Sequence, residues 1–115
     1  MTGGAGFLGG WILKALKAEG HDVRIFDRSP DRRILRDIAG DEADHVEWFE
    51  GDITDGAAVK SAAKDCASII HLAALLTPAC KNDPVLGATV NLIGTLKAFE
   101  AAKANGIARI AYASS

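Results

Sequence analysis

Apolar residues recur along the chain with two spacings, one helical and one strand-like. Leu8, Ile12 and Leu16 share one face of a helix over residues 7–19, and Gly20 follows as its stop signal. The adjacent Ile69 and Ile70 instead suit a strand that is covered on both faces. The pattern predicts helices over residues 7–19, 30–38, 55–64 and 83–105, and strands over residues 22–26, 46–49, 67–71 and 107–112. A polar connection is expected over residues 40–44 and a loop over residues 75–82.

Strands that alternate with helices predict right-handed βαβ units and a parallel sheet. The expected fold class is therefore α/β, with a doubly wound parallel sheet of the Rossmann type. No repeat or linker divides the sequence, so residues 1–115 are expected to form one domain.

Composition excludes several classes of function. The 115 residues are 49% hydrophobic and 24% charged, with a net charge of −2 and no Lys/Arg block, so we expect neither nucleic acid nor an anionic membrane as a partner. The most apolar stretch, residues 66–80, is interrupted by polar residues and too short for a membrane span. Cys66 and Cys80 are too few for a disulfide framework, which favours a cytoplasmic protein with reduced thiols.

A glycine-rich turn directly precedes the first helix. It matches two spacings, Gly4-x-Gly6-x-x-Gly9 and Gly3-x-x-Gly6-x-x-Gly9. In either one, glycines permit a tight turn, the approach of backbone to a pyrophosphate, and close packing of helix on strand. The helix N-terminus then offers amide groups to the phosphates. The turn therefore predicts a dinucleotide site.

An acidic residue closes the next strand. Asp27 stands where a carboxylate can accept hydrogen bonds from the hydroxyls of an adenosine ribose. The neighbouring Arg28 could instead favour a 2′-phosphate and hence NADP. Because Asp27 is retained beside it, we expect NAD, with NADP as the alternative.

Six segments in a fixed order carry a family resemblance. They are Thr2-Gly3-Gly4-Ala5-Gly6-Phe7-Leu8-Gly9, Asp27, Gly51-Asp52-Ile53, His71-Leu72-Ala73-Ala74, Asp83-Pro84 with Asn91-Leu92-Ile93-Gly94-Thr95, and Ile110-Ala111-Tyr112-Ala113-Ser114-Ser115. With these motifs the chain resembles the extended short-chain dehydrogenase/reductase family of NAD-dependent epimerases and dehydratases, over essentially its whole length.

The resemblance implies a set of cofactor-binding residues. Asp52 and Ile53 would contact the adenine, and the small Ala73 and Ala74 would let the cofactor lie against backbone. The full set is Gly3, Gly6, Phe7, Leu8, Gly9, Asp27, Arg28, Asp52, Ile53, Leu72, Ala73 and Ala74. No Cys/His cluster predicts a metal site.

The resemblance also implies the catalytic groups: a Ser or Thr, a Tyr, and a Lys four residues after that Tyr. Ser115 matches the catalytic Ser/Thr, and Ser114 matches its structural neighbour. The Tyr-x-x-x-Lys motif does not occur in the chain. Tyr112, the one tyrosine, lies in the last predicted strand and is not expected to be the catalytic base.

The beginning of the chain departs from the family pattern. Only Met1 precedes Thr2, where the family has a whole apolar strand at the centre of the sheet in the order 3-2-1-4-5. The strands on either side would leave unpaired amides along a gap, which is costly. We therefore expect a truncated copy of a longer protein that lacks most of the first strand and the C-terminal substrate part.

Three functions fit these observations. The first is the NAD-binding portion of an oxidoreductase, epimerase or dehydratase that transfers hydride on a small molecule, which we expect to be a nucleotide sugar; sterol or flavonoid-type substrates are the alternative. The second is a non-catalytic NAD(P) sensor, and the third is a nonfunctional fragment. The parent protein is expected to be an enzyme.

Three further features leave alternatives open. His71 has no metal partner at useful spacing, which favours a hydrogen-bonded core histidine over a ligand. Asn91 lies in mid-helix, where it holds active-site backbone or water, or faces solvent. The helix over residues 83–105 has a wide apolar arc, which predicts a homodimer; the alternative is cover by the sheet and the rest of the protein.

Overall fold

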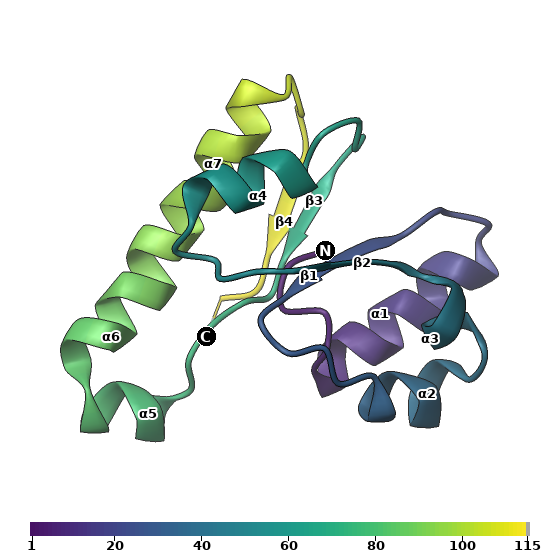
Figure 1. The fold of residues 1–115 in the computed structure, drawn as a ribbon, viewed down its shortest axis with the longest axis horizontal. Coiled ribbons are helices and arrows are strands. Elements are labelled where there is room, and N and C mark those ends of the chain that lie inside the picture. The colour runs from purple at the N-terminus through teal and green to yellow at the C-terminus, as the bar shows by residue number, and fades with distance from the viewer. Residues whose placement is uncertain (115) are drawn as a thin grey trace.

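The computed structural model describes residues 1–114 as one α/β unit (Figure 1). The strands are β1 (Arg24–Asp27), β2 (Glu47–Glu50), β3 (Ile69–His71) and β4 (Ile110–Tyr112). The helices are α1 (Phe7–Ala18), α2 (Arg33–Ala39), α3 (Glu42–His45), α4 (Gly56–Ala62), α5 (Thr77–Asn82), α6 (Pro84–Ala88), the π-helix η1 (Thr89–Ile93) and α7 (Gly94–Ala104). The predicted alternation of strands and helices is confirmed.

The sheet is parallel, and Thr2 joins its two halves. β1 pairs with β2, and β3 pairs with β4, both in parallel. Thr2 forms parallel bridges to Phe26 on one side and to His71 on the other, so the order β2-β1-Thr2-β3-β4 matches the expected 3-2-1-4-5. The expected gap is partly closed, because the Thr2 amide donates to Ile70 O at 2.9 Å and Phe26 N donates to Met1 O at 2.8 Å.

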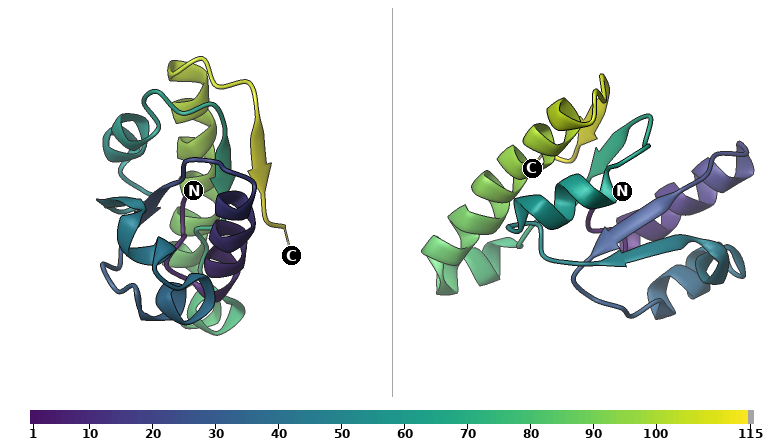
Figure 2. Two further views of the ribbon diagram at one scale, coloured as in Figure 1. Left: turned by 90° about the vertical axis from the view of Figure 1, so that its right-hand side faces the viewer. Right: turned by 45° about the horizontal axis from the view of Figure 1, so that its top comes forward.

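Helices lie on both faces of the sheet (Figures 1 and 2), and an apolar cluster fills the space on each face. Side chains alternate along a strand, so the neighbours Ile25 and Phe26 of β1 enter different clusters. Ile25 packs with Leu13 and Leu35 of α1 and α2. Phe26 belongs to the cluster beneath α4 and α7. Both faces of the central strands are thus buried, as in other doubly wound sheets.

Three predicted elements differ from the structure. The second helix begins at Arg33 rather than at Pro30, because the side chains of Ser29 and Asp31 bind the amides two residues on and hold the chain in turns. The short α3 lies in residues predicted as a polar connection, and α5 lies in residues predicted as a loop. At α5, Pro78 occupies the first turn, which suits the start of a helix.

The long predicted helix is present but interrupted by a π-turn. Asp83 caps its start by accepting a hydrogen bond from the Leu86 amide at 2.9 Å, as its position before Pro84 predicted. Between α6 and α7 the five residues of η1 are wound as a π-helix. Such turns add a residue to an otherwise regular helix and are frequent at functional sites. Here the turn carries Val90 and Asn91 toward the end of β3.

Candidate functional site

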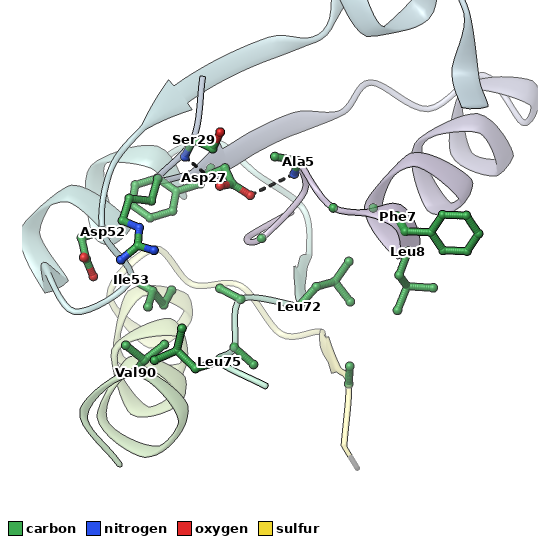
Figure 3. Close-up of a pocket in the computed structure, with 18 of the residues that line it drawn as sticks. Ala5, Phe7, Leu8, Asp27, Ser29, Asp52, Ile53, Leu72, Leu75 and Val90 are labelled. Atoms are coloured by element: carbon green, nitrogen blue, oxygen red, sulfur yellow. Dashed lines mark hydrogen bonds between the residues drawn. The ribbon is translucent and has the colours of Figure 1, made fainter. Parts of the chain in front are cut away.

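A groove of about 540 Å³ runs across the carboxyl ends of β1, β2 and β3 (Figure 3). In doubly wound sheets this edge, at the point where the strand order reverses, is where ligands bind. Every residue that was expected to hold the cofactor lies on the wall of this groove: Gly3, Gly6, Phe7, Leu8, Gly9, Asp27, Arg28, Asp52, Ile53, Leu72, Ala73 and Ala74.

Gly3 forms the tight turn between the sheet and the groove. Its φ of +66° lies in the left-handed region, which glycine adopts without strain. A Cβ atom there would stand 2.5 Å from the backbone nitrogen of Ala73, so any side chain would also collide with the segment after β3. The glycine turn and that segment can therefore lie in direct backbone contact.

Gly6 and Gly9 serve different needs at the start of α1. A Cβ on Gly6 would meet only Gly3 O, at 3.8 Å, so this side of the turn is open to a ligand. A Cβ on Gly9 would overlap the carbonyl group of Gly4, because helix and turn pack backbone to backbone. Gly4 itself is buried against Ile25. Of the two spacings found in the sequence, the one formed by Gly3, Gly6 and Gly9 lines the groove, whereas Gly4 does not.

The first turn of α1 faces the groove without a cap. Gly6 is the N-cap residue and supplies no side chain, and the first turn carries no acidic residue. The first-turn amides have no partner within the helix, and together with the helix dipole they favour an anion. Phe7 and Leu8 line the groove at this point (Figure 3).

Asp27 is tied to the glycine turn. One carboxylate oxygen accepts a hydrogen bond from the Ala5 amide at 2.9 Å, and the other accepts one from the Ser29 amide, also at 2.9 Å (Figure 3). Both bonds orient the carboxylate at the end of β1, within the groove. A carboxylate in this position can accept hydrogen bonds from ribose hydroxyls and repels a phosphate.

Asp52 and Ile53 form the neighbouring end of the groove. Asp52 accepts hydrogen bonds from the amide and the hydroxyl of Thr54, at 2.9 and 2.7 Å, and these bonds lower its pKa. The positive charge of Arg28 lowers the same pKa to a lesser degree. Ile53 is buried against Gly94 of α7. The pair thus offers one charged and one apolar surface.

Asn91 fastens the segment that follows β3. Its side-chain oxygen accepts a hydrogen bond from the Leu75 amide at 2.7 Å, and its nitrogen donates to the Leu75 carbonyl at 3.0 Å. Of the two readings of Asn91, the structure supports the one in which it holds site backbone. Leu75 lines the groove next to Ala73 and Ala74, so η1 positions part of the groove wall.

His71 is a buried core residue with a hydrogen-bond partner on each ring nitrogen. Its ring nitrogens lie 2.6 Å from the Thr2 hydroxyl and 3.0 Å from the Thr95 hydroxyl, and burial lowers its pKa. In residues 1–114 no three His, Cys, Asp or Glu side chains gather where they could hold a metal. The prediction of a hydrogen-bonded core histidine is confirmed.

The expected catalytic serine cannot be placed against the groove. Ser115 lies outside the described residues. Tyr112 is in β4 as expected, with its ring edge-to-face with Phe99 at 6.0 Å. Ala113, which follows Tyr112 in the chain, lines the groove. The C-terminal end of β4 thus reaches the site, whereas the Tyr112 ring packs on α7.

Several residues that line the groove were not among the predicted site residues. Ala5 and Gly51 stand inside two of the family motifs, and Ser29 follows the predicted Arg28, so their positions carried a signal. Val90 lies in the π-helix η1, and the helical periodicity gave no sign of its place at the groove. The missed residues are Ala5, Phe26, Ser29, Asp31, Ile34, Gly51, Leu75, Leu76, Val90 and Ala113.

None of the helices in residues 1–114 is both long enough and apolar enough to cross a membrane.

Comparison with known proteins identifies relatives over the whole chain. The model of the NAD dependent epimerase/dehydratase family matches residues 1–115. The UDP-glucose 4-epimerase of Mycolicibacterium smegmatis is 32% identical over 117 residues, which cover 100% of this chain and 37% of that protein. The NAD-dependent glucose-6-phosphate dehydrogenase of Haloferax volcanii is 35% identical, over 100% of this chain and 42% of that protein. The chain thus spans less than half the length of these relatives.

Solved structures share the fold. The UDP-glucose 4-epimerase of Thermus thermophilus, crystallised in complex with NAD, superimposes with a TM-score of 0.79 at 31% identity. The match covers 95% of this chain and 34% of that protein.

Proposed function

Because this chain belongs to the NAD-dependent epimerase/dehydratase family, we propose that its groove binds NAD and that its parent protein transfers hydride on a nucleotide sugar. The observation that carries the proposal is the Asp27 carboxylate, fixed by the Ala5 amide beside an open glycine turn. One wall of the groove thus suits a pyrophosphate and the adjacent wall suits a ribose.

The residues of the groove divide the cofactor between them. The α1 N-terminus and Gly6 would receive the pyrophosphate, since amides and an open backbone face that point. Asp27 would accept hydrogen bonds from the adenosine ribose, and Asp52 with Ile53 would flank the adenine. Ala73 and Ala74 would border the nicotinamide half. The groove fits the group because each of these surfaces matches one chemical part of a dinucleotide.

When bound, NAD would accept and return a hydride, which oxidises and then reduces a substrate carbon. The chain's own part is to bind and orient the cofactor. Ser115 is the proposed group that orients the reacting oxygen. The Tyr and Lys of the family motif would come from sequence outside this chain, as would the surfaces that choose the substrate.

The names of the relatives span more than one substrate class. One is named for a nucleotide sugar and one for a sugar phosphate. Others are named as a 3 beta-hydroxysteroid dehydrogenase and a vestitone reductase. We infer a nucleotide sugar and keep a sterol or flavonoid-type alcohol as the alternative. We also propose a cytoplasmic location. The two free cysteines favour it, because disulfides are rare in that compartment.

A non-catalytic NAD(P) sensor is the second candidate. Asp27 favours NAD over NADP, because its carboxylate would lie against a 2′-phosphate. The two candidates separate on sequence beyond residue 115: a downstream Tyr-x-x-x-Lys motif supports the enzyme, and a parent protein without one supports the sensor.

The first test is calorimetric titration of the chain with NAD and with NADP. We expect one NAD per chain and weaker binding of NADP. Gly6→Val should weaken NAD binding by about tenfold or more, because its side chain would occupy the approach to the turn. Ala18→Val, at the exposed far end of α1, is the matched control. A chain that is folded but takes up no NAD would overturn the proposal.

A homodimer is the partner we propose besides the substrate. Leu92 and Leu96 are 60% and 48% exposed on the helix over residues 83–105. Val85 and Phe99 extend this apolar face along the helix. A second copy would cover it, as would further sequence of the parent protein.

A further inference from the structure

A line of hydrogen bonds runs through His71 from the sheet to the helix over residues 83–105, the central helix. The side chain is 4% exposed at the end of β3. The Thr2 hydroxyl lies 2.6 Å from Nδ1, and the Thr95 hydroxyl lies 3.0 Å from Nε2. Thr95 in turn donates to the backbone carbonyl of Asn91 at 2.7 Å. The ring is therefore held from both sides.

Counting protons fixes the form of the ring. The one hydrogen of the Thr95 hydroxyl is used toward Asn91, so Thr95 must accept from His71, and Nε2 must carry a hydrogen. In the neutral ring Nδ1 then has a lone pair, which accepts the hydrogen of the Thr2 hydroxyl. The arrangement is complete only with neutral His71 in the Nε2–H form.

The line ends at groove-lining backbone on both sides. Thr2 precedes Gly3 of the tight turn, and its carbonyl accepts from the Leu72 amide at 3.0 Å. Asn91 holds Leu75 by two hydrogen bonds. His71 thus joins the glycine turn, the segment after β3 and η1.

We propose that His71 is a positioning residue of the groove, which holds the glycine turn and the central helix together only in its neutral form, so that the protein loses nucleotide affinity in mild acid. The inference rests on the proposed function, since it concerns affinity for NAD.

Within residues 1–114, no acidic side chain is hydrogen-bonded to the His71 ring, whose partners are the hydroxyls of Thr2 and Thr95. From β4 the register partner is Tyr112, whose ring packs on Phe99. On α7, Lys97 and Glu100 pair with each other at 3.0 Å. After β2, Asp52 is engaged by Thr54. Burial alone accounts for the lowered pKa of His71. Protonation would give Nδ1 a hydrogen and turn the Thr2 hydroxyl away.

The test combines ¹⁵N NMR of labelled histidines with NAD titrations between about pH 7.5 and about pH 4.5, a range that extends well below the ordinary histidine pKa. We expect the Nε2–H form for His71 and protonation below the ordinary histidine pKa, because burial lowers the pKa of His71. NAD affinity should fall by about tenfold as His71 gains its proton. His71→Asn should weaken binding at pH 7.5 and flatten the pH profile, whereas His45→Asn should change neither.

Thr95→Val provides a second variant in case His71→Asn does not fold. It removes the acceptor for Nε2–H at nearly constant volume, so NAD affinity should fall and the ¹⁵N shifts of His71 should change. Wild-type NAD binding that stays unchanged while His71 gains its proton, or a His71 pKa at or above the ordinary histidine value, overturns the proposal and leaves the proposed function standing. Loss of NAD binding at every pH with the Nε2–H form intact overturns the proposed function and the effect on affinity together.

Discussion

The Asp27 carboxylate accepts a hydrogen bond from the backbone amide of Ala5 at 2.9 Å. This bond joins the end of β1 to the glycine turn, so the two surfaces that would receive the ribose and the pyrophosphate are held in one geometry. A substitution that displaces either surface should therefore displace the other.

Replacement of this carboxylate should change cofactor preference. Asp27→Ala removes both the acceptor for a ribose and the charge that opposes a 2′-phosphate, while Arg28 remains beside it. We expect NAD affinity to fall by about tenfold and the preference for NAD over NADP to shrink or reverse. Calorimetric titration with both nucleotides measures this. Asp37→Ala, on the exposed face of α2, should leave both affinities unchanged. An unaltered preference in Asp27→Ala would remove Asp27 from the site.

Substitutions at two glycines of the turn should have different effects, one on the free energy of unfolding and the other on NAD affinity. Gly9→Ala forces a Cβ into the Gly4 carbonyl, and such overpacking costs about 1–3 kcal/mol of the free energy of unfolding. Gly6→Ala meets only a contact at 3.8 Å, so it should leave stability within about 1 kcal/mol and act on NAD affinity. Urea unfolding and NAD titration of both variants test the contrast. Equal stabilities would contradict the backbone contact at Gly9.

The two hydrogen bonds between Asn91 and Leu75, the Asn91 clamp, should slow exchange of the Leu75 amide with solvent. Asn91→Leu removes both hydrogen bonds to Leu75 at similar volume, so the Leu75 amide should exchange faster. NAD affinity should fall several-fold, since each lost hydrogen bond is worth about 1 kcal/mol. Hydrogen exchange with NMR detection measures the first effect. Asn82→Leu, at the exposed end of α5, is the control. Unchanged exchange at Leu75 would show that η1 does not hold this segment.

Acid should destabilise the protein partly through Asp52. Hydrogen bonds from Thr54 lower the folded-state pKa of Asp52 from its ordinary 3.8. The unfolded chain therefore takes up a proton first, and the stabilisation, present above about pH 4, is lost as the pH falls through the lowered value. Thr54→Val should reduce the difference in Tm between pH 6 and pH 3, whereas the exposed Thr77→Val should not. An equal loss of Tm in wild type and Thr54→Val would contradict this.

The apolar helix face gives a test of assembly. If two copies meet there, Leu92→Asp and Leu96→Asp should each give monomers by light scattering, because a charge would be buried in the interface. Lys103→Asp, at the far end of α7 and outside this face, should keep the wild-type mass. A monomeric parent protein would exclude the dimer.

The fold was predictable because its signals are local. Turn, helix, strand and acid follow one another in the first 27 residues. Helix ends are also marked by single residues: Gly20 follows the end of α1, and Asp55 caps α4 through the amides of Ala57 and Ala58. Many of the groove-lining residues could then be predicted as well, because the carboxyl ends of the strands in a parallel sheet meet at one edge.

What the sequence did not reveal depends on contacts between distant residues. Val90 lines the groove from the π-helix η1, and a periodicity of 3.6 residues contains no sign of that π-turn. The tie between Asn91 and Leu75 and the line through His71 likewise join residues far apart in sequence. The start of α2 at Arg33 follows from the competition of Ser29 and Asp31 side chains with the helix.

The π-turn also limits how this stretch of the chain can change in length. One residue of an α-helix corresponds to a rotation of about 100°. Deletion of a residue within η1 would restore regular winding but would swing α6 and everything before it around the helix axis, while Thr95 and α7 kept their orientation. The apolar residues of α6 and the Asn91 clamp would then point to new neighbours. Insertions and deletions should therefore be tolerated at the exposed turns near Gly40 or Gly106 long before they are tolerated here.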